Sequence, residues 1–443
     1  MHRGPFFVSY QISLSSNKIL MHDWEVLFMI SAGDTGFVLL CAALVFFMTP
    51  GLALFYGGLV RRKNVINTMM SSVFLIGVSI VLWVLFGYSL AFSGNVGGVI
   101  GDLNWFGLNG VGMEPGPYSD TIPNLAFAAF QMMFAIITPA LITGATAGRM
   151  KFKAQVIFMV LWSFLVYYPM AHMVWGQDGF LGAGGLHSVD FAGGNVVHIS
   201  SGVSALVLCI VLGKREGYQK QAYRTHNVPM VAFGACVLLF GWFGFNAGSA
   251  LAADGLAAHA FMTTAASCGA AVVSWMLIEA IHNGKPTLVG TATGMVAGLV
   301  AITPGAGFIP VWSAVILGLL VSPICYFMIS FVKKKLGYDD ALDAFGCHGI
   351  GGIFGGIGTG LFALTSINGA AEWNGLLFGD TELFVAQLLS IVITIGVSVV
   401  GTLICILITK LITPLRVSKR EEQIGLDISE HNESAYPSFN GLD

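Results

Sequence analysis

The feature of this sequence that most restricts its fold is a series of long apolar runs. A helix needs roughly 20 residues to cross a bilayer, and eleven runs approach or exceed that length, at 34–60, 66–92, 124–147, 154–175, 195–212, 228–250, 256–281, 288–304, 310–332, 344–366 and 383–411. Only 10% of the residues are charged, whereas soluble domains carry about 25%. The runs are continuous, unlike the alternating strands of about ten residues in a membrane barrel. We therefore predict an all-α integral membrane protein with eleven transmembrane helices.

The lysines and arginines indicate how this chain is oriented. Of the 20 such residues, all but Arg3 and Lys18 fall in loops on one side of the predicted spans or around the end of the last span. Such loops are normally cytoplasmic. We predict an extracytoplasmic N-terminal segment (1–33), a transmembrane domain (34–411) and a cytoplasmic tail (412–443) in the inner (plasma) membrane.

Two segments that open helices five spans apart resemble each other. DFAGGNVVHIS (190–200) opens the fifth span and DAFGCHGIGG (343–352) opens the tenth, each with an Asp and a Gly ahead of a His. Helices five spans apart insert in opposite directions, so the similarity predicts an inverted five-plus-five repeat with the eleventh helix as an addition. We expect Asp190 to cap the fifth helix, with Asp343 as its counterpart before the tenth.

The repeated segments place His198 and His348 inside apolar helices. A titratable side chain in a membrane span is costly and usually faces a cavity, so both histidines are candidates for function. The span boundaries put His198 toward the outside and His348 toward the inside. The sequence leaves open whether the two side chains meet.

Aromatic residues gather near the outer ends of the third, fourth and sixth predicted spans. Phe130 and Phe134 lie one helical turn apart, as do Phe245 and Ser249, and Trp175 ends the fourth span. Taken singly, each has an ordinary explanation, since tryptophan is common at membrane interfaces and phenylalanine on lipid-facing surfaces. As a group they predict a cation–π site at the outer mouth, with a hydroxyl to accept an N–H.

Several function classes find no support in the sequence. The net charge is −3 and no stretch is strongly basic, so we expect no nucleic-acid partner. No zinc motif, phosphate loop or Ser-His-Asp arrangement stands out. We expect no metal, no cofactor and no enzymatic activity. A membrane enzyme with a metal on His198 and His348 is a weaker alternative, because no third ligand is evident.

Several longer motifs, taken in order, are similar to those of one family. They are GLALFYGGLVRRKN (51–64), FGYSLAF (86–92), AHMVWG (171–176), DFAGGNVVHIS, GWFGFNAGS (241–249), DAFGCHGIGG and the tail segment GLDISEHNESAY (425–436). From 34 to 436 the chain resembles the ammonium transporter (Amt/Rh) superfamily, on its Amt side. The resemblance implies a homotrimer with one pore in each protomer.

The resemblance also implies roles for individual residues. The matching positions are an outer ammonium site at Phe134, Trp175 and Ser249 with Phe130 in its vestibule, a phenylalanine gate at Phe134 and Phe245, a pore pair near the midplane at His198 and His348, and a structural aspartate at Asp190. The tail implies regulation by a PII-type nitrogen regulatory protein. It departs from the family pattern at 431–433, which read His-Asn-Glu where His-Gly-Glu is expected.

These residue types suit the selection of ammonium over potassium. The two ions have the same charge and nearly the same size, but only ammonium can lose a proton. An apolar passage disfavours the charged form, and histidines in such a passage are able to relay a proton. The resulting hypothesis is recruitment of NH4+, its deprotonation, and conduction of NH3 with or without separate proton transfer. The alternatives are an ammonium sensor with little flux and a Rhesus-like neutral gas channel.

Overall fold

The apolar runs fold into helices in the computed structural model, which describes residues 30–221 and 223–436. The predicted N-terminal segment (1–33) therefore lies outside the described residues except for 30–33. The elements are α2 (Ala32–Leu59), η1 (Arg62–Asn64), α3 (Val65–Leu82), η2 (Trp83–Gly87), α4 (Tyr88–Phe92), η3 (Phe106–Leu108), β1 (Pro115–Gly116), β2 (Ser119–Pro123), α5 (Asn124–Thr146), α6 (Phe152–Trp162), η4 (Ser163–Tyr167), α7 (Tyr168–Trp175), η5 (Gly194–Ile199), α8 (Ser200–Leu212), α9 (Val228–Gly248), α10 (Gly255–Asn283), α11 (Leu288–Ile302), α12 (Val311–Phe327), η6 (Met328–Val332), α13 (Lys333–Leu336), η7 (Phe345–Gly349), α14 (Ile350–Phe362), η8 (Leu376–Phe378), α15 (Glu382–Ile412), α16 (Lys419–Ile424) and α17 (Leu426–His431).

Within the described residues, nine helices are long and apolar enough to cross a membrane. The chain is therefore a multi-pass membrane protein. The two other predicted spans correspond to shorter helical pieces. One is α11, with 15 residues, and the other joins the five-residue π-helical turn η7 to the 13-residue α14. The count of eleven spans and the inverted repeat stay predictions.

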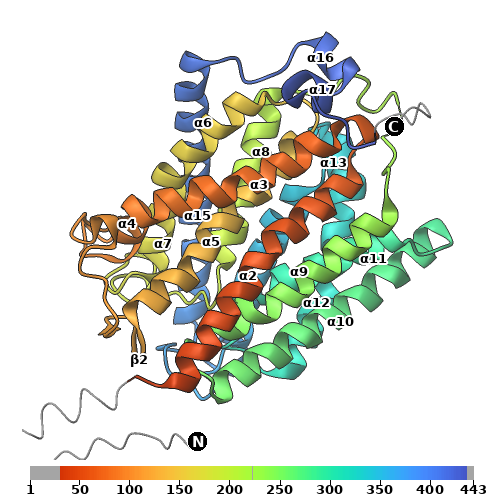
Figure 1. The fold of residues 1–443 in the computed structure, drawn as a ribbon. Helices are drawn as coiled ribbons and strands as arrows, with labels where there is room; N and C mark the ends of the chain where they lie inside the picture. Colours follow the sequence, from red (N-terminus) through yellow and green to blue (C-terminus); the bar gives the residue numbers. More distant parts are fainter. Residues whose placement is uncertain (1–29, 222, 437–443) are drawn as a thin grey trace, which may run out of the picture.

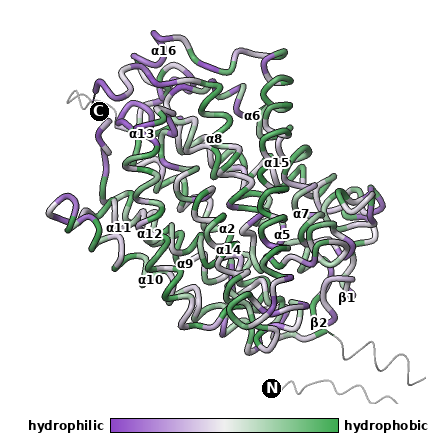
Figure 2. The backbone as a smooth tube through the Cα atoms, turned by 180° about the vertical axis from the view of Figure 1, so that it is seen from behind, coloured by the Kyte–Doolittle hydropathy of each residue, from purple (hydrophilic) through white to green (hydrophobic). Residues whose placement is uncertain are grey.

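The helices form an oblique bundle with different elements at its two ends (Figure 1). The tail helices α16 and α17 lie at one end, and β2 and the start of α2 lie at the other. The predicted odd number of spans would place the two ends of the chain on opposite sides of the bundle in this way. Figure 2 shows mostly hydrophobic helices, with hydrophilic stretches near α16 and α13, in the loop beside α11 and in the connections near α7 and β1.

Helices α2 and α9, the first and sixth predicted spans, pack closely because glycines face the contact. A Cβ added at Gly58 would lie 2.7 Å from a methyl of Val231, and one added at Gly234 would lie 2.4 Å from the backbone nitrogen of Phe55. Membrane helices gain stability from such close packing of small residues, because lipid offers no hydrophobic driving force for their association.

The tail is attached to the bundle through the starts of two helices. Asp427 accepts hydrogen bonds from the backbone N–H groups of Val65 (3.0 Å) and Asn67 (2.9 Å) at the start of α3. Glu430 accepts one from the N–H of Phe152 (2.9 Å) at the start of α6. Carboxylates are favourable at helix N-termini because they satisfy free N–H groups and oppose the helix dipole.

The departure from the family pattern in the tail occurs where α17 ends. Asn432 has φ 52° and ψ 37°, which is the left-handed conformation. Glycine adopts this conformation without strain, and asparagine tolerates it better than most residues. Asparagine therefore suits the backbone turn at this position.

Candidate functional site

A small cavity lies at the end of the bundle that carries β1 and β2. Its volume is about 150 Å³, and its walls are Tyr118, Phe127, Gln131, Phe134, Trp175, Phe191, Ser249 and Leu251. Three of the four predicted recruitment residues, Phe134, Trp175 and Ser249, thus surround one space. We call it the outer cavity.

Hydrogen bonds hold two of these side chains in place. The indole Nε1 of Trp175 donates to the carbonyl oxygen of Asp190 (2.9 Å), and the ring meets Phe134 edge-on with centroids 5.8 Å apart. Ser249 Oγ donates to the carbonyl oxygen of Phe245 (2.9 Å). Because its proton is used in this bond, the hydroxyl oxygen keeps lone pairs for an N–H donor in the cavity.

Phe130 lies behind the wall of the outer cavity instead of lining it. Its ring packs against Phe134 with centroids 5.0 Å apart at 69°. On its other side it contacts α9, where a Cβ added at Gly248 would lie 2.7 Å from the Phe130 ring. Phe130 therefore supports Phe134 from within the core.

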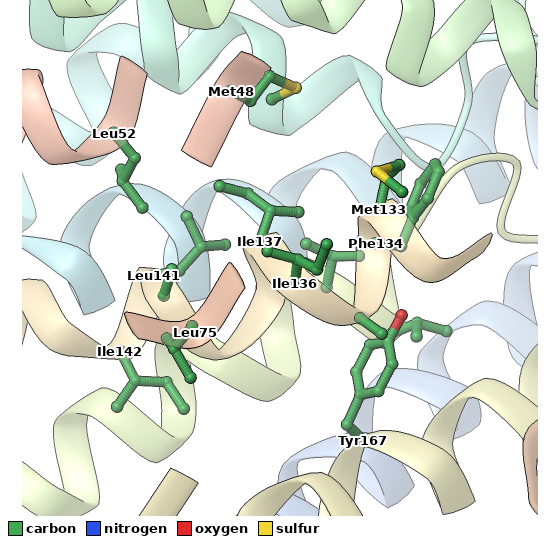
Figure 3. Close-up of a cluster of buried hydrophobic side chains, with 14 of the residues drawn as sticks. Met48, Leu52, Leu75, Met133, Phe134, Ile136, Ile137, Leu141, Ile142 and Tyr167 are labelled. Carbon is green, nitrogen blue, oxygen red and sulfur yellow. The ribbon is translucent and has the colours of Figure 1, made fainter. Parts of the chain in front are cut away.

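Phe134 and Phe245 separate the outer cavity from a second space. Their ring centroids are 4.3 Å apart, with a 34° angle between the planes. Phe134 lines the outer cavity and Phe245 lines the second space. Figure 3 shows Phe134 on α5 within a cluster of buried apolar side chains that includes Met133, Ile136 and Ile137.

The second space, which we call the inner cavity, is narrow and mostly apolar. Its volume is about 10 Å³, close to the lower limit for one water molecule. It is lined by His198 and His348 together with Met48, Leu52, Ile137, Leu141, Val197, Leu238, Trp242, Phe245 and Val296.

His198 and His348 meet in the inner cavity. Their Nδ1 atoms lie 3.3 Å apart, their ring planes differ by 19°, and the two residues are 1% and 4% exposed. When both rings are neutral, one Nδ1 donates and the other accepts. The pair then carries one Nε2 that accepts hydrogen bonds and one that donates them. His198 Nε2 is buried and has no hydrogen-bond partner among the described residues.

Two glycines allow the helices that carry the histidines to cross. A Cβ at Gly202 would lie 2.2 Å from the backbone nitrogen of Gly349, and a Cβ at Gly352 would lie 3.0 Å from Cβ of His198. Each glycine follows the histidine of its own helix by one turn. The helix backbones approach so closely here that a side chain on either one would separate the imidazoles.

Asp190 caps the helix that carries His198. Its buried carboxylate accepts hydrogen bonds from the N–H groups of Gly193 (2.8 Å), Gly194 (2.6 Å) and Asn195 (2.7 Å). Its own carbonyl oxygen binds Trp175. One residue thus sets both the start of the histidine helix and the orientation of the cavity tryptophan.

The counterpart of Asp190 before the tenth predicted span is Asp340, so the expectation for Asp343 is wrong. Asp340 accepts from the N–H groups of Ala344 (3.1 Å) and Phe345 (2.8 Å), while Asp343 pairs with Lys333. Burial raises the pKa of Asp340 above its usual value. Asp340 precedes His348 by the same number of residues as Asp190 precedes His198. This equal spacing is the sequence feature that could have identified Asp340 as the counterpart of Asp190.

The sequence prediction did not single out two residues that border the cavities. Gln131 lines the outer cavity, and its Oε1 is buried with no hydrogen-bond partner in the described part of the chain. Trp242 stacks on His198 with centroids 5.4 Å apart and donates from Nε1 to Thr303 Oγ1 (2.9 Å). The sequence does contain a signal for each of them. Gln131 is a polar residue between Phe130 and Phe134, and Trp242 lies one turn from Phe245.

The comparisons with known proteins agree with the motifs. Residues 36–436 match the profile of the Ammonium Transporter Family. The ammonium transporter of Bacillus subtilis (strain 168) is 52% identical over 405 residues, which cover 91% of this chain and 98% of that protein. The crystal structure of Saccharomyces cerevisiae Mep2 superposes with a TM-score of 0.82 at 35% identity, covering 89% of each chain. A structure described as a sensor Amt protein superposes with a TM-score of 0.81 at 27% identity, covering 90% of this chain and 98% of that one. The predicted resemblance is thereby confirmed.

Proposed function

Because the chain belongs to the Ammonium Transporter Family, a family of transporters and not of enzymes, we propose that it carries ammonium through the path from the outer to the inner cavity. NH4+ binds in the outer cavity, loses a proton near the gate formed by Phe134 and Phe245, and crosses the inner cavity as NH3. The main support is the buried pair His198 and His348, whose Nδ1 atoms lie 3.3 Å apart in an otherwise apolar passage.

Recruitment at the outer cavity needs attraction for a cation without a full countercharge. The faces of Trp175 and Phe134 supply cation–π attraction, worth about 0.5–2 kcal/mol per contact. The hydroxyl oxygen of Ser249 and the free Oε1 of Gln131 are acceptors for the N–H groups of ammonium. Weak attraction of this kind concentrates the ion and still allows it to leave.

Passage through the inner cavity excludes ions that cannot lose their charge. An unpaired ion in an apolar medium pays a desolvation cost that reaches tens of kcal/mol in the idealised limit. Potassium has no neutral form, whereas ammonium becomes NH3 by releasing a proton. The unpartnered Nε2 of His198 is positioned to accept a hydrogen bond from ammonia or to hold the proton. The proton then crosses along the pair or returns to the outside.

Currents on solid-supported membranes test this function. Full-length protein in liposomes should respond to an ammonium pulse with a saturable current and to an equal potassium pulse with none, because only ammonium sheds its charge. Empty liposomes are the control. Ammonia flux without current would instead favour a neutral gas channel. No flux at all, despite saturable ammonium binding, would contradict transport.

The double substitution Trp175→Leu and Ser249→Ala tests recruitment. We expect the ammonium concentration for half-maximal current to rise roughly tenfold, since lost contacts worth about 1.4 kcal/mol weaken binding by that factor. Current at saturating ammonium should change less. Trp312→Leu is a matched control, because Trp312 is a tryptophan of α12 that is 54% exposed and does not line the outer cavity. An unchanged half-maximal concentration would leave Trp175 with an interfacial role only.

Assembly, orientation and regulation belong to the same proposal. The protein forms a homotrimer in the inner (plasma) membrane, with its N-terminus outside and its tail in the cytoplasm. The tail binds a PII-type nitrogen regulatory protein. The one-sided distribution of lysine and arginine supports the orientation, and the contacts of Asp427 and Glu430 with α3 and α6 support a tail that acts on the bundle.

Removal of the tail tests this part of the proposal. A chain truncated after residue 417 loses Asp427 and Glu430 and leaves the starts of α3 and α6 uncapped. We expect it to insert into the membrane but to transport less. The PII protein of the same source should bind the full-length chain and not the truncated one, in titrations with ATP or ADP. Failure to bind under every nucleotide condition would contradict the partner.

A sensor is the second candidate function, because the sensor Amt protein matches 90% of this chain at 27% identity. It predicts tight ammonium binding with negligible current. The current measurements above distinguish it from a transporter.

A further inference from the structure

A third cavity, with different chemistry, lies at the other end of the bundle, between the α2–α3 loop and the last described residues of the tail. Its volume is about 410 Å³, and it is lined by Arg61, Arg62, Lys63, Asp427, Ile428, Ser434 and Tyr436. Three consecutive cations of one loop therefore border one space. The ammonium path has no part in this cavity, and a cation would be repelled from it.

The positive charge of this basic cavity is not neutralised by carboxylates. Among the ion pairs of the described residues, none involves Arg61, Arg62 or Lys63. Asp427 is the acidic residue in the wall, but both of its oxygens accept backbone N–H groups of α3. Burial also raises the pKa of Asp427 above its usual value. The nearby carboxylate of Glu422 is paired with Arg416 (2.8 Å).

Aromatic rings hold the two guanidinium groups. Arg61 lies over the ring of Tyr223, 4.6 Å from its centroid, and Arg62 over that of Tyr436, at 5.1 Å. A stacked guanidinium keeps its N–H edge available for acceptors in its plane. Arg61 Nη2 is buried and has no hydrogen-bond partner within residues 30–221 and 223–436. Arg62 Nη2 also donates to the carbonyl oxygen of Tyr436 (3.4 Å), and Lys63 Nζ donates to that of Gln423. The remaining N–H groups of these three side chains, including Arg61 Nη2, still outnumber the acceptors that the described residues offer them.

From this donor set we infer that the basic cavity binds a phosphoryl group, either as free phosphate or a small phosphorylated molecule, or as the headgroup of an anionic phospholipid. Guanidinium groups pair with phosphate oxygens through two parallel hydrogen bonds, and lysine adds a point charge. The hydroxyl of Ser434 in the cavity wall is a further donor. A bound phosphoryl group would connect the α2–α3 loop to the last described residues of the tail.

The test uses the full chain in nanodiscs of phosphatidylcholine, with radiolabelled inorganic phosphate in equilibrium dialysis. Wild type should bind phosphate saturably, and Arg61→Gln with Arg62→Gln should weaken binding by roughly tenfold or more, since charge-assisted bonds are about twice as strong as neutral ones. The control, Lys214→Gln with Lys334→Gln, removes the same charge from side chains that do not line the basic cavity. It should bind as wild type does.

A second arm distinguishes the source of the phosphoryl group. Purified protein is incubated with equal amounts of phosphatidylglycerol and phosphatidylcholine, and retained lipid is counted by native mass spectrometry. Preferential retention of phosphatidylglycerol that is lost in the arginine variant assigns the site to a lipid headgroup. Phosphate binding without this preference assigns it to a soluble ligand. The variant Arg61→Lys with Arg62→Lys keeps both positive charges but lacks the planar guanidinium groups that bind phosphate through two parallel hydrogen bonds. It should therefore bind phosphate with intermediate strength, which would show that the cavity is still folded in the variants.

Two outcomes would overturn the inference. One is that wild type binds neither phosphate nor phosphatidylglycerol in preference to phosphatidylcholine. The other is that the lysine control loses as much binding as the arginine variant, because that would indicate general attraction to a positive surface.

Discussion

Replacing His198 and His348 together with leucine is expected to abolish the selective ammonium current or to convert it into a leak. Leucine fills a similar volume but has no nitrogen to accept a hydrogen bond or carry a proton. Each single replacement leaves one imidazole without the Nδ1 contact at 3.3 Å, so we expect a fall of at least about tenfold, which corresponds to about 1.4 kcal/mol in the barrier. Ammonium and potassium currents should be recorded on the same membranes.

His282→Leu is the matched control for the histidine experiment. His282 lies in the last turn of α10 and bonds to Tyr326, away from the inner cavity, so this variant should conduct as wild type does. A double variant that keeps full ammonium current and shows no potassium leak would refute the role of the pair. The transport function itself would survive that result.

Replacing Asp190 with alanine is expected to be the most destabilising single change near the path. It would leave the N–H groups of Gly193, Gly194 and Asn195 without their acceptor inside the protein. A buried N–H group that loses its acceptor typically costs about 1–3 kcal/mol, and three such groups are affected here. The thermal unfolding temperature in detergent should fall sharply, and ammonium current should be lost because Trp175 and His198 lose their positions.

Asp190→Asn and Asp178→Ala calibrate this effect. Asparagine keeps one acceptor oxygen at the helix start, so its loss of stability should be intermediate. Asp178 is an exposed residue of the loop after α7, and its replacement should change the unfolding temperature little. Equal unfolding temperatures for Asp190→Ala and Asp178→Ala would show that the cap contributes little stability.

The sequence alone determined the membrane class, most of the helices and the family of this protein. The reason is that these properties depend on local patterns. A continuous apolar run in lipid satisfies its backbone groups only within its own helix, so run length predicts each span. Helical periodicity likewise placed Phe130 with Phe134 and Phe245 with Ser249 on common faces. The long motifs then identified the family, because they combine many specific residues in one order.

Local sequence patterns could not predict the contacts between segments that are far apart in the sequence. Asp340 and Asp343 both precede the same helix, and only the path of the chain decides which carboxylate reaches its free N–H groups. Phe130 shares a helix face with Phe134, but α9 covers it and removes it from the cavity wall. Three basic residues in a row predicted a cytoplasmic loop, and the tail was needed to close a cavity over them.

Only the tertiary structure decided that the two histidines meet. His198 and His348 are 150 residues apart, and the span boundaries placed them toward opposite faces of the membrane. They come together because their two helices cross with almost no space between the backbones. That crossing needs a glycine on each helix at the point where the other arrives, at Gly202 and Gly352. A glycine's suitability for such a contact depends on the helix opposite, and its sequence neighbours do not reveal which helix that is.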